Sequence, residues 1–181
     1  MNENSVLRCD NVEKSALRTI RLHLSDLDVK RLFQKAGEAG LTVSELLENF
    51  IADLIGSSHS NGSDERDYAD RWYNRCWFGA FQDYTFLYFL LQWDSVEEVL
   101  ELWNDIEEGK KEIGDICKNP EDYEPDEYVA LQEDIAYWQE QLDDYWNNYN
   151  EVNTGYKKGT LEEEMQKVLT WKKQLDVILV T

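Results

Sequence analysis

The sequence predicts a mainly α-helical protein with one short strand near the N-terminus. Prolines and glycines are scarce, with two and nine in 181 residues, and apolar residues recur mostly at three- and four-residue spacing. Residues 18–24 alternate instead with period two. We therefore expect a small strand-containing unit, followed by a larger, acidic antiparallel helical bundle.

The strand prediction rests on residues 18–24 (RTIRLHL), which follow residues 1–16, where no periodicity is visible and we expect a flexible tail. Apolar and polar side chains alternate along this stretch, as they do in a strand that is buried on one face. The apolar face holds Ile20, Leu22 and Leu24, and the polar face holds Thr19, Arg21 and His23.

Two short helices are predicted after the strand. Ser25 and Asp28 have the spacing of a capping box, and so do Thr42 and Glu45. The second helix should run to about Ile55. The Gly-, Ser- and Asn-rich stretch that follows predicts a linker over residues 57–66. The chain then divides into a unit of residues 17–56 and a domain of residues 67–181.

The larger domain begins with eleven aromatic residues between positions 68 and 93. We expect this segment to lie in the interior, as one helix or as two helices broken near Gly79. Ser95 with Glu98, Pro125, and Thr160 with Glu163 mark the starts of three further helices.

Apolar residues of these three helices recur at heptad spacing, which predicts antiparallel packing into a bundle. The first of the three seams passes through Lys110 and ends at Cys117. The most regular seam holds Tyr128, Leu131, Ile135, Trp138, Leu142, Tyr145 and Tyr149.

The net charge of −20 lies almost entirely in the second part of the chain. Residues 1–56 carry a charge of −2, and residues 57–181 carry −18. Such a surface repels phosphate backbones and attracts basic proteins, including those that handle nucleic acid. Solubility alone is the other interpretation. The carboxylates that we expect to contact a partner are Glu97, Glu98, Glu101, Asp105, Glu108, Asp122, Asp126, Asp143 and Asp144.

Nothing in the sequence points to catalysis, so we expect no enzyme activity, catalytic residue, metal or cofactor. Cys9, Cys76 and Cys117 are far apart, only two histidines are present, and glycine-rich phosphate loops are absent. The most apolar stretch, residues 84–91, is too short to span a membrane. With no secretion signal recognised at the start, we expect a cytoplasmic protein without membrane contact.

Residues 19–55 resemble the ribbon-helix-helix family of DNA-binding regulators. In that family two chains pair their strands antiparallel, and the resulting ribbon enters the major groove of DNA. The resemblance implies a homodimer formed through the N-terminal strand and operator DNA as a partner. Two alternatives remain open: the ribbon serves only for dimerisation, or the strand pairs inside the larger domain.

The same resemblance implies which residues meet DNA. The strand would direct Thr19, Arg21 and His23 toward base edges, and Arg21 is the best candidate because a guanidinium can donate two hydrogen bonds to guanine. Backbone amides at the start of the second helix would contact phosphates, at Thr42, Val43 and Ser44. Residues 14–35 carry a local charge of +4, which favours this contact.

Three functions are compatible with this organisation. The architecture is similar to phage and mobile-element inhibitors, including anti-CRISPR proteins, and to antitoxins. On that basis the acidic domain would block a basic nuclease or toxin, while the ribbon-helix-helix head represses transcription of its own gene. The alternatives are a plain transcriptional regulator, whose helical domain oligomerises or senses a ligand, and an assembly protein that uses the ribbon only to dimerise.

Overall fold

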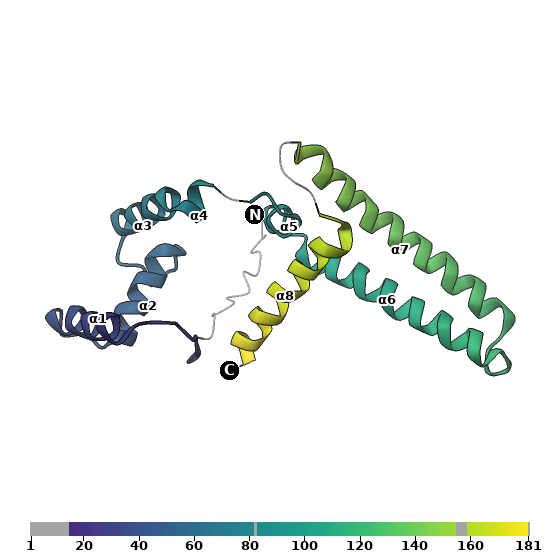
Figure 1. Ribbon diagram of the computed structural model, residues 1–181, viewed down its shortest axis with the longest axis horizontal. Coiled ribbons are helices and arrows are strands. Elements are labelled where there is room, and N and C mark those ends of the chain that lie inside the picture. The colour runs from purple at the N-terminus through teal and green to yellow at the C-terminus, as the bar shows by residue number, and fades with distance from the viewer. Residues whose placement is uncertain (1–14, 82, 155–158, 181) are drawn as a thin grey trace, which may run out of the picture.

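The computed structural model describes residues 15–81, 83–154 and 159–180. These residues form eight α-helices and one 3-10 turn, so the mainly α prediction is confirmed. Figure 1 shows two groups of helices, α1–α4 and α5–α8. The bounds are α1 (Asp26–Glu38), α2 (Val43–Leu54), α3 (Ser63–Arg75), α4 (Trp77–Ala80), α5 (Phe86–Gln92), α6 (Val96–Lys118), η1 (Pro120–Asp122), α7 (Pro125–Val152) and α8 (Leu161–Val180).

The predicted strand is not formed in the single chain. Residues 15–25 belong to no helix or strand, and no other described segment offers a strand with which they could form a ladder. Ile20, Leu22 and Leu24 are 58%, 59% and 49% exposed. The alternating pattern therefore has no partner within the described part of this chain.

The first two helices begin where the sequence predicts. Ser25 Oγ accepts the Asp28 backbone N–H (3.2 Å) at the start of α1. At the start of α2, Thr42 Oγ1 accepts the Glu45 N–H (3.2 Å) and the Glu45 carboxylate accepts the Thr42 N–H (2.7 Å), which completes the capping box. Between the helices, Gly40 adopts φ 72°, a conformation that glycine reaches without steric cost.

The starts of the later helices agree only in part with the prediction. Pro125 occupies the first turn of α7, and Thr160 and Glu163 form the expected reciprocal hydrogen bonds at the start of α8. The capping box predicted at the start of α6 is wrong. Ser95 precedes α6, but its hydroxyl donates to the Trp93 carbonyl (3.1 Å) and caps no backbone amide.

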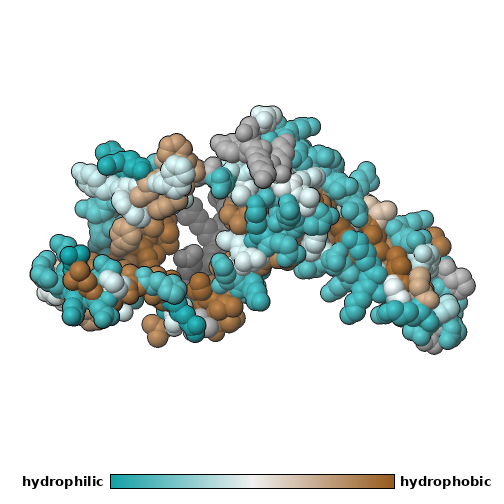
Figure 2. All heavy atoms as spheres, in the orientation of Figure 1, coloured by the Kyte–Doolittle hydropathy of each residue, from teal (hydrophilic) through white to brown (hydrophobic). Residues whose placement is uncertain are grey.

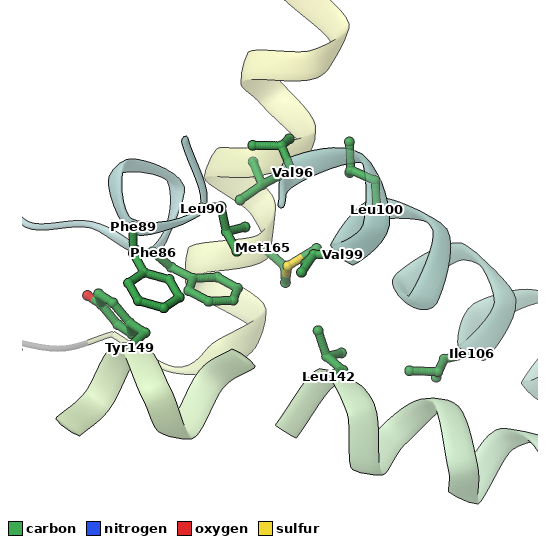
Figure 3. Close-up of a cluster of buried hydrophobic side chains, with 11 residues drawn as sticks. Phe86, Phe89, Leu90, Val96, Val99, Leu100, Ile106, Leu142, Tyr149 and Met165 are labelled. Carbon is green, nitrogen blue, oxygen red and sulfur yellow. The ribbon is translucent and has the colours of Figure 1, made fainter. Parts of the chain in front are cut away.

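The hydrophobic core lies where α5, α6, α7 and α8 meet (Figure 3). Each helix contributes side chains that are almost fully buried, and these side chains form one cluster. Its members are Phe86, Phe89, Leu90, Val96, Val99, Leu100, Ile106, Leu142, Tyr149, Met165 and Val168.

One acidic side chain is buried at the edge of this core. Glu164 of α8 is 3% exposed, and its carboxylate accepts the Phe86 backbone N–H at the start of α5 (2.9 Å). It also forms an ion pair with Lys167. Nearby, the Tyr149 hydroxyl donates to the Tyr84 carbonyl (3.0 Å) and accepts from the Asn153 amide (2.8 Å). These polar contacts join α5, α7 and α8 around the apolar cluster.

The expected three-helix bundle is realised at one end only. α6 and α7 run antiparallel and extend away from the core as a pair, which we call the arm (Figure 1). α8 packs against α5 and reaches α6 near its start, where Lys172 pairs with Glu97 (3.0 Å). Every residue of the heptad predicted in α7 is buried or half-buried, so this seam is confirmed.

The seam of α6 differs from the prediction. Gly109 and Ile116 are buried, whereas Lys110 and Cys117 are exposed. A Cβ on Gly109 would lie 2.8 Å from Cγ1 of Ile135 on α7. The missing side chain thus lets the two helices approach closely. The glycine also explains why Lys110 is predicted in the seam. A seam predicted from the spacing of apolar side chains does not include a glycine, which has no side chain.

The prediction that residues 68–93 lie in the interior is half wrong. Phe86, Phe89 and Leu90 of α5 are buried, but the rings on α3 and α4 are not. α3 packs on α2 and on α4, and the rings of α3 and α4 make edge contacts near the surface instead of entering the core. The helix breaks at Cys76, three residues before Gly79, which lies inside α4. The exposed rings of residues 68–93 belong to Tyr68, Trp72, Tyr73, Trp77, Phe78, Phe81 and Trp93.

We predict that the two glycines of α6 respond in opposite ways to alanine. Gly109→Ala should destabilise the protein by about 1–2 kcal/mol, because overpacking against Ile135 outweighs the gain of about 1 kcal/mol in helix propensity. Gly114→Ala, which meets no atom within 4 Å, should stabilise it by about 0.5–1 kcal/mol. Denaturant unfolding measures both, and equal shifts for the two variants would contradict the seam.

Candidate functional site

The residues expected to read DNA lie in the segment before α1. Thr19, Arg21 and His23 are all exposed. Their neighbour Arg18 makes a contact that sequence reasoning missed. Its guanidinium donates to the carbonyls of Ile178 (3.4 Å) and Leu179 at the end of α8. The C-terminal end of a helix carries partial negative charge, so a cation is favourable there.

The start of α2 presents the backbone amides expected to contact phosphate. Val43 and Ser44 are the first two residues of α2, where the N–H groups have no acceptor within the helix. Glu45 lies at the same end, and hydrogen bonds from the backbone and hydroxyl of Thr42 lower its pKa. A charged carboxylate therefore shares this helix end with Thr42, Val43 and Ser44. It weakens the attraction for phosphate without occupying the first two amides.

The unit formed by residues 17–56, which we call the head, lacks a core of its own. Among the residues of α1 and α2, only Ala36 and Ala52 are buried. Figure 2 shows hydrophobic side chains gathered on the surface of this half of the molecule. A large uncovered apolar surface on a small unit indicates a missing partner. The exposed apolar residues of the head are Leu17, Ile20, Leu22, Leu24, Leu27, Val29, Phe33, Phe50, Ile51 and Ile55.

The carboxylates predicted to bind a partner fall on both helices of the arm. On α6, Glu97, Glu101, Asp105 and Glu108 are four, four and three residues apart, so they share one face. Neighbours in this row are about 4.5–6 Å apart along the helix axis. All four are exposed, and Glu97 is the member that pairs with Lys172. We call Glu97, Glu101, Asp105 and Glu108 the α6 acidic row.

The remaining predicted carboxylates do not join this row. Asp126 and Asp144 of α7 are 18 residues apart, which is five helical turns, so they share a face of their own helix. Asp143 points about 100° away from that face. The side chain of Asp122 lies outside the described residues. All of the described members of this set are exposed, and Figure 2 shows hydrophilic side chains along the arm.

Glu98, the last of the predicted set, does not belong to the α6 acidic row. It interacts with Tyr145 of α7 instead. Burial, and then the neighbouring Glu98 carboxylate, raise the pKa of Tyr145 to about 12. This carboxylate is exposed, and it interacts with Tyr145 across the two helices of the arm.

Two surface hollows are absent from the sequence-based expectations. A cavity of about 530 Å³ lies between α6 and α8, where Leu100, Leu169 and Val177 line it beside Glu97 and Lys172. A second cavity, of about 380 Å³, lies on α3 and is lined by Tyr68, Arg71, Trp72, Arg75 and Cys76. The sequence shows arginines and aromatic residues alternating at helical spacing on this segment. Because the segment is expected to be buried, the pattern does not predict a surface site.

Within the described ranges, no group of three or more histidine, cysteine, aspartate or glutamate residues could hold a metal ion. In the same ranges, no helix is long and apolar enough to cross a bilayer.

We predict that Tyr145 makes folding sensitive to alkaline pH. Its pKa is near 10 in an unfolded chain and about 12 in the fold, so the folded state holds the proton more tightly. The associated stability is present below pH 10 and is lost as the pH rises toward 12. Tyr145→Phe should flatten the fall in unfolding free energy over this range, whereas Tyr137→Phe, at an exposed position of α7, should not. Identical pH profiles for wild type and Tyr145→Phe would refute this.

Comparisons of the chain with protein-family models, with curated proteins and with solved structures found no match.

Proposed function

We propose that this protein is a non-enzymatic DNA-binding regulator whose head acts as a ribbon-helix-helix dimer on operator DNA. The uncovered apolar surface of the head is the observation that carries the proposal. The predicted strand segment, residues 18–24, and the two capped helices α1 and α2 all carry exposed apolar side chains, and they would form half of a dimer core in the order that the family has.

A second copy of the chain would supply what the single chain lacks. Pairing two copies of residues 18–24 antiparallel forms the missing ladder and places Ile20, Leu22 and Leu24 of both copies on one face, where the helices of the dimer would cover them. Because successive side chains of a strand point to opposite faces, Thr19, Arg21 and His23 then project from the other side. A two-stranded ribbon fits the major groove of DNA.

We expect Arg21→Ala to lower the affinity for the preferred duplex at least tenfold, because one bidentate contact to guanine contributes about 1–3 kcal/mol. Binding is measured with duplexes selected from a random-sequence library by the full-length protein. Arg31→Ala removes the same charge from the exposed surface of α1 and serves as the control. Equal losses for Arg21→Ala and Arg31→Ala, or no duplex selected, would rule out base reading by the strand.

The α6 acidic row favours a second function for the same protein, the inhibition of a basic nucleic-acid-handling protein such as a CRISPR effector nuclease or a toxin. Among the described residues, Glu101, Asp105 and Glu108 form no ion pair, so they keep their charge for a partner. Carboxylates in a row on a rigid helix can occupy a groove that otherwise binds phosphates. This function and DNA binding use different parts of the chain.

Inhibition is tested by measuring substrate cleavage by a panel of CRISPR effector nucleases and nuclease toxins with the full-length protein added. Replacing Glu101, Asp105 and Glu108 together by glutamine or asparagine should abolish the inhibition of any enzyme that the wild type blocks. Glutamine substitutions at Glu133, Glu140 and Glu151, which lie on α7 and remove the same charge, should preserve it. If no enzyme in the panel is blocked, or if both triple variants lose activity equally, the plain regulator is the better description.

A further inference from the structure

The arginines of this chain are distributed differently from its lysines. All seven arginines lie within the first 75 residues, and none lies in residues 76–181. Carboxylates outnumber basic residues about twofold in the whole chain, yet every ion pair among the described residues uses a lysine. The described guanidinium groups of the N-terminal half are therefore not used to neutralise the protein's own carboxylates.

Two of these arginines belong to the cavity on α3. Tyr68, Arg71, Trp72 and Arg75 follow the i, i+3, i+4, i+7 pattern, so they share one face of the helix. Together with Cys76 they line a hollow of about 380 Å³ that no carboxylate of the described residues lines. The Arg71 guanidinium carbon lies 6.0 Å from the centre of the Tyr68 ring.

Both aromatic rings of this face are exposed, and Trp72 is supported from behind. Tyr68 is 69% exposed and Trp72 is 45% exposed. The Trp72 ring contacts Phe50 of α2 (5.6 Å between ring centres) and Phe78 of α4 (6.0 Å) in edge-to-face geometry. These contacts hold the indole in place and leave part of it open to solvent.

We propose that this face of α3 binds single-stranded nucleic acid, a ligand separate from the duplex assigned to the strand of the head. Arginine is well suited to phosphate, because its planar guanidinium donates several hydrogen bonds at once. Exposed aromatic rings stack on nucleobases, and only unpaired bases offer a free face. Tyr68 and Trp72 thus hold bases, and Arg71 and Arg75 hold the phosphates between them.

The shape and the position of the face favour a strand over a free nucleotide. The hollow is open and lies on a single helix, whereas pockets for small molecules enclose most of the ligand surface. α3 also belongs to the group of helices opposite the acidic arm (Figure 1). Salt screens charges over about 10 Å at 0.1 M, so the carboxylates of the arm repel a strand on α3 only weakly.

The test measures binding of fluorescein-labelled oligothymidylate to the full-length protein by anisotropy. Arg71→Ala and Arg75→Ala should each lower the affinity about tenfold, and each should reduce the slope of log affinity against log salt concentration by about 0.7, the value for one neutralised phosphate of a single strand. Tyr68→Ala should lower the affinity by about tenfold, because one base then has no ring on which to stack. Far-ultraviolet circular dichroism and thermal unfolding confirm that each variant is folded.

Arg66→Ala is the matched control, because it removes the same charge from the same helix. The Arg66 guanidinium donates to the Ser60 hydroxyl (2.8 Å), outside the hollow, and the affinity should stay within about twofold of the wild type. Arg21→Ala should also leave single-strand affinity unchanged, so failure of duplex binding does not affect this result.

Three results would overturn the assignment. In the first, oligothymidylate does not bind, or Arg66→Ala weakens binding as much as Arg71→Ala does. In the second, a duplex of the same length binds through Tyr68 and Arg71 as tightly as the single strand. In the third, thymidine monophosphate competes as effectively per molecule as the oligonucleotide, which would indicate a nucleotide pocket.

Discussion

The structure depends on the junction at which α5 meets α7 and α8. α5 has seven residues and could not persist as an isolated helix, so its position is set by what surrounds it. Phe86, Phe89 and Leu90 insert into the apolar cluster. The Glu164 carboxylate accepts the first amide of α5, which satisfies a donor that the helix cannot satisfy itself. The junction also fixes the end of the arm, because Val99 and Leu142 belong to the same cluster.

The buried carboxylate of Glu164 must be compensated by polar partners at this junction. A carboxylate taken out of water costs several kcal/mol unless hydrogen bonds and a cation compensate it, and here the Phe86 amide and Lys167 provide both. A hydrophobic side chain at position 164 would avoid that cost but would leave the α5 amide without a partner. The polar contacts therefore select one arrangement of α5, α7 and α8 from the several that apolar packing alone allows.

Local patterns predict most of the helices, and the failures arise where tertiary contacts decide. The heptad of α7 is correct because seven large side chains at regular spacing leave one face for burial. The sequence pattern does not predict that Gly109 lies in the seam of α6, because a glycine has no apolar side chain to continue the pattern. The rings of α3 and α4 are expected in the interior because composition cannot show whether a covering element exists. The strand is not formed within the described part of the chain, because its alternating pattern has no pairing segment there.

The candidate sites divide in the same way. Exposure of the α6 acidic row follows from helix periodicity, so the sequence suffices to locate it. Arg21 is exposed, but so are its apolar neighbours, because the strand that would bury one face is not formed. The α3 cavity cannot be located by pattern, because the same spacing of Tyr68, Arg71, Trp72 and Arg75 fits a helix packed against other helices. Only the positions of α2 and α4 show that this face of α3 is open.

Because the head lacks a core of its own, its state depends on how much of the protein a cell contains. In the dimer proposed above, the stability of the head depends on protein concentration, whereas the junction around Phe86 is complete within one chain. At low copy number the proposed dimer would dissociate while the arm persists, and at high copy number the dimer would form. The balance between the proposed DNA binding and the proposed inhibition would then depend on how much of the protein the cell expresses.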